Sequence, residues 1–112
     1  MSQAETLPSS IRMIKERLDQ PSLQQSLKGF SKTIQFSLTD LKEDYVFKLD
    51  DGRVSSLEKK SEPNANIIIT TTNTLMEGTM NKRENAATAY MTGKIKVKGA
   101  MEDLMRLQGL MM

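Results

Sequence analysis

The chain has 112 residues, of which 38% are hydrophobic and 27% charged, so we expect one globular domain spanning residues 1–112. The formal net charge is only +2, and the aromatic residues are three Phe, two Tyr and no Trp, which argues against a nucleic-acid partner. The absence of cysteine and histidine excludes disulfides, thiol catalysis and zinc sites with Cys or His ligands.

Two helices are predicted before the first strand. The segment LPSSIRMIKERL, residues 7–18, has apolar side chains at helical spacing, with Ser9 or Ser10 as the expected N-cap. Pro21 suits the first turn of a second helix, which we expect to end at Gly29. The apolar positions of the first helix are Leu7, Ile11, Ile14 and Leu18.

Four strands should follow. The segments KTIQFSLTD (32–40) and DYVFKLD (44–50) alternate apolar and polar residues, which is typical of half-buried strands and places Phe36 and Phe47 on inward faces. Asp51-Gly52 predicts a tight hairpin turn, so residues 53–60 should return antiparallel. Residues 65–72, ANIIITTT, are rich in β-branched side chains and predict a fourth strand.

The pattern then changes to helix, strand and helix. Thr74 and Glu77 have the spacing of a capping box, and Asn81 and Glu84 have a related form that predicts a second helix ending before Gly93. Residues 94–98, KIKVK, alternate as a last strand, and residues after Gly99 predict a final helix. The order is α-α-β-β-β-β-α-α-β-α, which indicates an α+β fold: a five-stranded, mostly antiparallel sheet with helices covering one face.

The final helix has more apolar surface than a core-facing helix needs. Its apolar side chains span about 160°, where about 100° would suffice, and Gln108 lies within that arc. The surplus is explained if a small sheet and neighbouring helices bury all of it. It is equally consistent with a cavity wall or a partner surface, and flexible methionine side chains suit either role.

No convincing catalytic constellation is present. Ser56 and Lys59 match Ser-x-x-Lys, but residues three apart on a strand point to opposite faces. The acidic pairs near residues 43 and 50 fall in predicted turns, and no glycine-rich phosphate loop or EF-hand is found. We therefore expect a protein that is not an enzyme and has no cofactor or metal. No apolar run approaches the roughly 18–20 residues of a membrane span, and no signal-peptide core is seen, so a cytoplasmic location is expected.

The last part of the chain resembles the lipid-binding domain of the sterol carrier protein 2 family. The closest similarity is in AYMTGKIKVKGAMEDLMRLQ (89–108), where the family has an aromatic residue, a Gly-Lys-hydrophobic-Lys strand, a glycine and a helix. Upstream, TTTNTLMEGTM (70–80) is similar to the family's strand and short helix. The resemblance implies a sheet covered by helices, with an apolar tunnel between them.

The resemblance also implies non-covalent binding and transfer of a fatty acid, fatty acyl-CoA, sterol or phospholipid. The residues expected to line the tunnel are Phe36, Phe47, Leu75, Met76, Met80, Tyr90, Met91, Met101, Leu104, Met105 and Gln108. The expected partner is therefore an apolar lipid, with transient contact at a membrane surface and a homodimer as further interactions. A protein–protein or dimerisation module that uses the surplus face of the last helix is the alternative.

Overall fold

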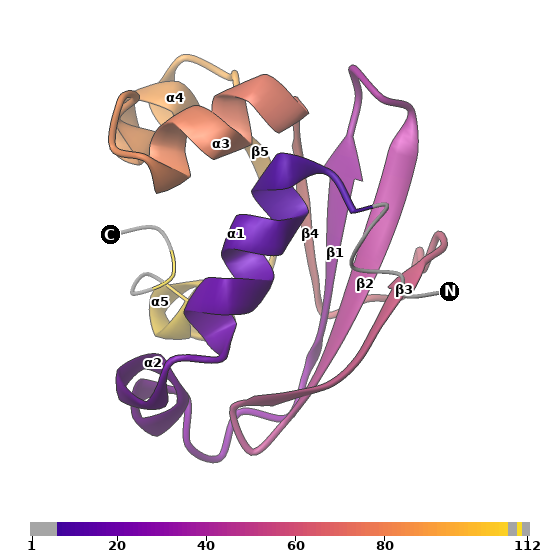
Figure 1. The fold of residues 1–112 in the computed structure, drawn as a ribbon, viewed down its shortest axis with the longest axis vertical. Helices are drawn as coiled ribbons and strands as arrows, with labels where there is room; N and C mark the ends of the chain where they lie inside the picture. The colour runs from indigo at the N-terminus through magenta and orange to yellow at the C-terminus, as the bar shows by residue number, and fades with distance from the viewer. Residues whose placement is uncertain (1–6, 108–109, 111–112) are drawn as a thin grey trace.

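The computed structural model describes residues 7–107 and Leu110 (Figure 1). The order of helices and strands confirms the predicted one. The elements are α1 (Ser9–Leu18), α2 (Pro21–Ser26), β1 (Thr33–Leu38), β2 (Glu43–Asp50), β3 (Arg53–Lys59), β4 (Ile67–Thr71), α3 (Asn73–Met80), α4 (Ala86–Met91), β5 (Lys96–Gly99) and α5 (Met101–Arg106). In this described part of the chain, no helix is both long and apolar enough to cross a membrane.

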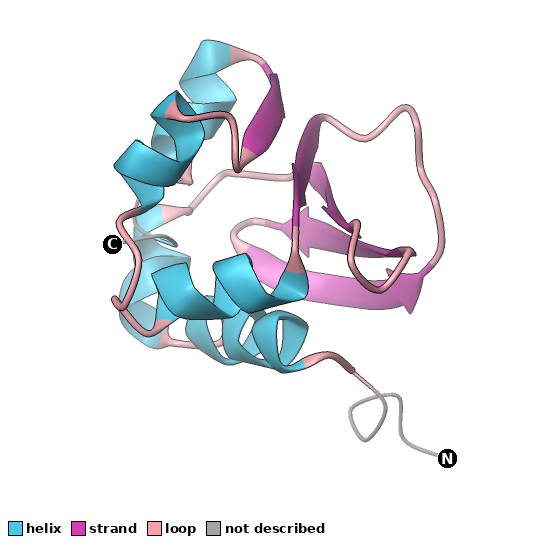
Figure 2. Cartoon of the chain, turned by 90° about the horizontal axis from the view of Figure 1, so that it is seen from above, coloured by secondary structure: helices cyan, strands magenta, loops and turns pink. Residues whose placement is uncertain are grey.

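The strands form a five-stranded sheet in the order β3-β2-β1-β4-β5. Three of the four neighbouring pairs are antiparallel, and β1 and β4 run parallel, with Phe36 opposite Ile69. The sheet is therefore mixed but mostly antiparallel, as predicted. Figures 1 and 2 show the helices gathered on one face of it.

The core lies between that face and the helical layer. Ile11, Ile14 and Leu18 on α1 are completely buried, because their spacing places them on one stripe of the helix. From the sheet, Phe36 and Phe47 meet edge to face, with ring centroids 5.5 Å apart. This arrangement is favourable for two aromatic quadrupoles and contributes about 0.5–1.5 kcal/mol beyond simple burial.

The predicted turn between β2 and β3 is present and packs against α2 and the residues that follow it. Asp51 and Gly52 have φ angles of 52° and 81°, which suit a hairpin turn of the primed type. The Gly52 amide donates a hydrogen bond to the Phe30 carbonyl at 2.9 Å. A Cβ at Gly52 would lie 2.7 Å from the Leu27 carbonyl oxygen, so glycine is needed here for space as well as for φ.

The helix N-caps differ from the predicted ones. The Thr72 side chain accepts a hydrogen bond from the Leu75 amide and caps α3, two residues before the predicted cap Thr74. Asn85 caps α4 in the same way, whereas the segment after Asn81 forms a turn. Several polar residues in succession satisfy the same cap pattern, and tertiary contacts select one of them. The first helix has Pro8 at its N-cap and no side-chain cap.

The final helix is also shorter than predicted. α5 ends at Arg106, and Leu107 and Leu110 beyond it are buried, with exposed fractions of 5% and 0%. The apolar arc expected for the final helix extended past Arg106 to Gln108, whereas the regular helical angle applies only as far as the helix continues.

Candidate functional site

Four of the predicted lining residues lie together in the interior. Phe36 on β1, Phe47 on β2, and Met76 and Met80 on α3 are all buried and belong to one apolar cluster. Leu75 and Leu104 are half-buried and pack against the same cluster. The structure therefore brings six of the predicted residues to the boundary between sheet and helices, and their role in lipid binding stays a prediction.

Four others lie on the surface. On α4, Tyr90 is 56% and Met91 is 83% exposed, and on α5, Met101 is 71% and Met105 is 60% exposed. These side chains are separate from the interior cluster in the structure. The remaining residue, Gln108, falls outside the described residues.

Arg17 connects α1 to Met80 at the end of α3 and to Leu110 beyond α5. Its guanidinium donates hydrogen bonds to the Leu110 carbonyl at 3.0 Å and to the Met80 carbonyl at 3.1 Å. The planar fork of arginine suits this double contact, because its donors are held in fixed directions. The sequence pattern did not reveal this role, since Arg17 occupies an ordinary position beside the apolar stripe of α1.

α5 makes polar contacts along its edge in addition to the apolar packing of Leu104. Arg106 donates to the Lys28 carbonyl at 2.8 Å, and its guanidinium lies 5.7 Å from the centre of the Phe30 ring. Asp103 pairs with Lys32 at 3.7 Å. None of the residues of α5 itself is fully buried. The contacts of Arg106 are exposed and therefore weak, because water competes for them.

The opposite end of α1 is fixed to α3 by a polar network. The Asn73 side-chain oxygen accepts hydrogen bonds from the Ser10 amide at 3.1 Å and from the Ser10 hydroxyl at 2.6 Å. The Ser9 hydroxyl donates to the Glu77 carboxylate. These bonds occupy the serines that the sequence had suggested as caps, so α1 and α3 form a connected pair.

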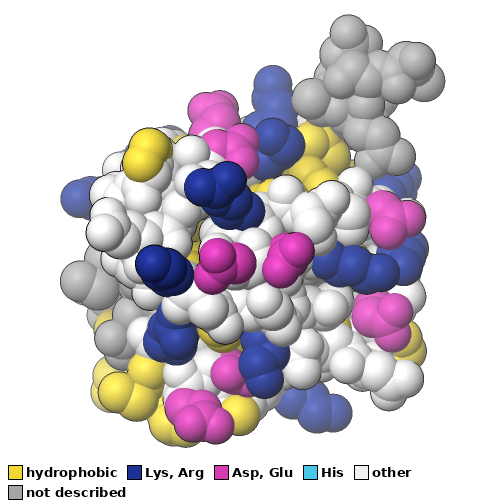
Figure 3. Space-filling view, turned by 90° about the horizontal axis from the view of Figure 1, so that it is seen from below, with side chains coloured by type: hydrophobic (Ala, Val, Ile, Leu, Met, Phe, Trp, Pro, Cys, Tyr) yellow, Lys and Arg dark blue, Asp and Glu magenta, His cyan; other side chains and the backbone are white. Residues whose placement is uncertain are grey.

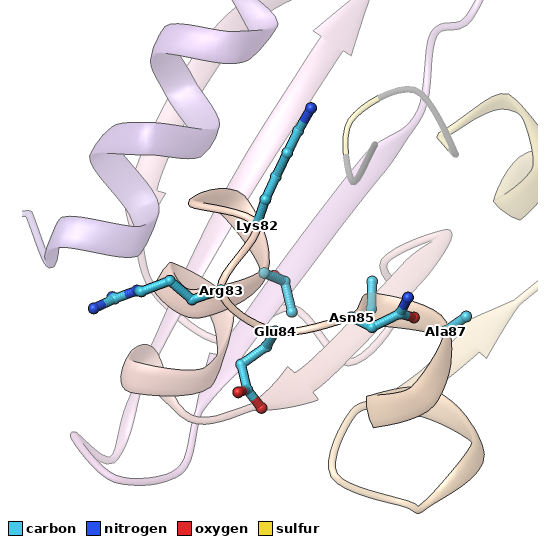
Figure 4. A pocket seen from close by; sticks show the side chains of 7 residues that line it. Lys82, Arg83, Glu84, Asn85 and Ala87 are labelled. Atoms are coloured by element: carbon cyan, nitrogen blue, oxygen red, sulfur yellow. The ribbon is translucent and has the colours of Figure 1, made fainter.

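A surface pocket of about 570 Å³ lies beside the connection between α3 and α4 (Figure 4). It is lined by Thr79, Lys82, Arg83, Glu84, Asn85, Ala86 and Ala87. None of these is a predicted lipid-lining residue. In Figure 4 the side chains of Lys82, Arg83 and Glu84 point in different directions, so their charges do not converge on a common point.

A polar cluster at the start of β2 shifts the pKa values of Glu43 and Tyr45. The Tyr45 hydroxyl donates to Glu43 at 2.7 Å, and Lys59 pairs with the same carboxylate at 3.0 Å. The hydrogen bond from Tyr45, followed by that from Lys59, lowers the pKa of Glu43. Burial and the neighbouring carboxylate raise the pKa of Tyr45. The pairing explains both shifts and gives neither residue a free group for acid–base chemistry.

Within the described residues, no group of three acidic side chains is placed to hold a metal ion. The arrangement defines a class of protein: a small α+β domain whose apolar interior lies between a sheet and one layer of helices. The chain matches the SCP-2 sterol transfer family over residues 11–112, and it therefore belongs to that family. The resemblance in the sequence is thereby confirmed.

Solved structures show the same fold. Sterol carrier protein 2 matches with a TM-score of 0.71 and 12% identity, covering 93% of this chain and 88% of that one. The apo form from Yarrowia lipolytica matches with a TM-score of 0.63 and 24% identity, covering 99% and 93%. The sec-alkylsulfatase Pisa1 from Pseudomonas sp. matches with a TM-score of 0.66 and 22% identity over 79% of this chain. No curated protein matches.

The alkylsulfatase similarity concerns one part of a larger enzyme. This chain spans only 14% of the alkylsulfatase chain, so the fold is shared there and the enzyme's activity is not transferred. Membership of the SCP-2 family supports lipid binding or transfer in general. A lipid-carrier domain also fits a protein without catalysis of its own.

Proposed function

We propose that this protein binds an apolar lipid non-covalently between its sheet and its helices and transfers it between membranes. The match to the SCP-2 sterol transfer family over residues 11–112 carries this proposal. The ligand is a fatty acid, a fatty acyl-CoA, a sterol or a phospholipid, and the compartment is the cytoplasm. Residues 1–112 act as one binding unit.

The composition of the interior supports this function. The boundary between α3 and the sheet is built from Phe36, Phe47, Met76 and Met80, which offer no charged group to an acyl chain. Burying each methylene contributes about 0.8 kcal/mol. Micromolar affinity corresponds to about 8 kcal/mol, so roughly ten methylenes supply it without a specific head-group contact.

A lipid requires space that these side chains now occupy. Methionine has three rotatable bonds and fills irregular space, so Met76 and Met80 change shape at low cost. Leu107 and Leu110 are buried, although α5 itself has no fully buried residue. We therefore place the lipid's entry beside α5, where these leucines move outward and the acyl chain takes over their contacts.

Lipid uptake is tested by native mass spectrometry of the purified protein and by titration with a fluorescent fatty acid. A lipid that co-purifies, and saturable binding at micromolar concentration, are expected. Met76→Trp fills the interior and should weaken binding at least tenfold, whereas Leu41→Trp at an exposed turn should not. Circular dichroism and urea unfolding check that both variants are folded. The proposal is wrong if the wild-type protein carries no lipid and shows no saturable binding.

A further inference from the structure

An exposed apolar and basic surface lies where α4 turns into β5. We define the α4–β5 surface by Tyr90, Met91, Lys94, Lys96 and Lys98, all of which are exposed. Between Glu84 and Glu102 the sequence contains these three lysines and no acidic residue. A single exposed methionine needs no explanation, but Met91 and Tyr90 beside uncompensated positive charge form a combined feature.

Backbone geometry brings the end of α4 and the start of β5 together. The Gly93 amide donates to the Tyr90 carbonyl at 3.1 Å, and the Lys94 amide donates to the Ala89 carbonyl at 2.8 Å. Gly93 has φ of 80°, which lets the chain reverse directly after the helix. Figures 1 and 2 show α4 and β5 beside one another at one edge of the molecule.

Strand alternation directs the lysines away from the core. Val97 packs against the apolar cluster, so Lys96 and Lys98 lie on the other face of β5. β5 is an edge strand, paired only with β4. Among residues 7–107 and Leu110, the lysines in ion pairs are Lys15, Lys32, Lys59 and Lys60. The three lysines of the α4–β5 surface therefore keep their charge available to a partner.

We propose that the α4–β5 surface docks this protein on an anionic phospholipid bilayer. Lysines near such a surface each strengthen partitioning about fivefold, so the three together contribute about 100-fold. Tyrosine favours the boundary between head groups and acyl chains, and Met91 inserts its thioether chain at the same level. Docking at this edge would place the helical layer next to the source of the lipid.

Other partners fit this surface less well. A symmetric contact with a second copy would bring like charges together, because the same lysines would meet across the two-fold axis. The apolar residues Ile11, Ile14 and Leu18 of α1 are fully buried in the core, so they are not exposed to a membrane. The apolar side chains of the α4–β5 surface, by contrast, are already in water and are released from it on docking.

Flotation with vesicles tests the docking. Vesicles of phosphatidylcholine alone are compared with vesicles containing 30% phosphatidylserine, at low salt and at 0.5 M salt. The protein should float only with the anionic vesicles, and high salt should release it. The triple variant Lys94→Gln, Lys96→Gln, Lys98→Gln should lose about 100-fold in partitioning, and Tyr90→Ser with Met91→Ser about tenfold.

The matched control is the triple variant Lys28→Gln, Lys42→Gln, Lys48→Gln. It changes the formal net charge from +2 to −1, as the test variant does, but alters exposed lysines elsewhere. Equal losses for the two triple variants, or equal binding to both vesicle types, would overturn the proposal. A dimer seen by light scattering that is lost in the test variant, without vesicle binding, would also overturn it.

This inference extends the proposed lipid transfer, and the two are separable by experiment. Titration with fluorescent fatty acid in the absence of vesicles measures the interior alone. Loss of flotation with intact fatty-acid binding is expected for the Lys94, Lys96 and Lys98 variant. Wild-type protein that binds fatty acid but never floats with anionic vesicles would refute the docking and leave the carrier function standing.

Discussion

Replacement of Arg17 by methionine tests how the segment after α5 is held. The change removes guanidinium hydrogen bonds to the carbonyls of Met80, at 3.1 Å, and Leu110, at 3.0 Å, while keeping much of the aliphatic stem. A hydrogen bond to a charged group contributes about 1.5–3 kcal/mol. Arg17 is only half-buried, so water replaces part of the loss, and we expect a decrease of about 2–3 kcal/mol in the free energy of unfolding.

Urea unfolding at pH 7 measures this decrease, with Arg12→Met as the control. Arg12 lies on the same helix but is exposed, so its replacement should lower the free energy of unfolding by less than about 0.5 kcal/mol. Hydrogen exchange provides a local readout, because the Leu110 amide donates to the Leu107 carbonyl at 2.9 Å and should exchange faster in Arg17→Met. Equal stabilities of the two variants would refute the structural role assigned to Arg17.

Two further predictions concern the backbone and acid stability. Gly52→Ala should lower the free energy of unfolding by about 2–4 kcal/mol, because φ is 81° and the new Cβ would lie 2.7 Å from the Leu27 carbonyl oxygen. Gly78→Ala should change the free energy of unfolding by under about 1 kcal/mol, since its Cβ meets only the flexible Glu84 side chain. Thermal unfolding of both variants checks this. The hydrogen bonds from Tyr45 and Lys59 lower the pKa of Glu43, so their stabilisation is present above the unfolded-state pKa and is lost as pH falls through the folded-state pKa. The difference in free energy of unfolding between wild type and Glu43→Gln should therefore shrink from pH 7 to pH 3. A difference that stays constant over this range would contradict the stabilising role assigned to these hydrogen bonds.

The strands were predictable from the sequence, but one of their pairings was not. Alternation between apolar and polar residues is a local property, and it located β1 and β2 directly. The parallel pairing of β1 with β4 depends on how the connection after β3 crosses the sheet. The Asn66 side chain, which accepts a hydrogen bond from the Thr33 amide at 2.9 Å, and the Gln35 side chain, which accepts one from the Glu62 amide, fix that crossing. Such side-chain contacts between distant residues leave no period in the sequence.

In the candidate site, too, the sequence pattern predicted local properties but not long-range contacts. Apolar periodicity identified Met76 and Met105 equally well, yet the first is buried and the second is 60% exposed. The pattern reports which residues are apolar, whereas burial depends on where a helix ends and what packs beside it. Leu110, which is fully buried beyond the end of α5, was not among the predicted lining residues for this reason.

This division between interior and surface residues separates two steps of lipid transfer. A side chain that contacts a bound acyl chain affects affinity in solution, whereas one that contacts only the bilayer affects encounter with the membrane. Met76 belongs to the first group by burial and Met91 to the second by exposure. Substitution of Met76 should therefore alter fatty-acid affinity without changing vesicle flotation, and substitution of Met91 should do the reverse. If both substitutions changed both measurements to the same degree, the exposed residues would have to enter the lipid site on binding, and α4 would have to move inward.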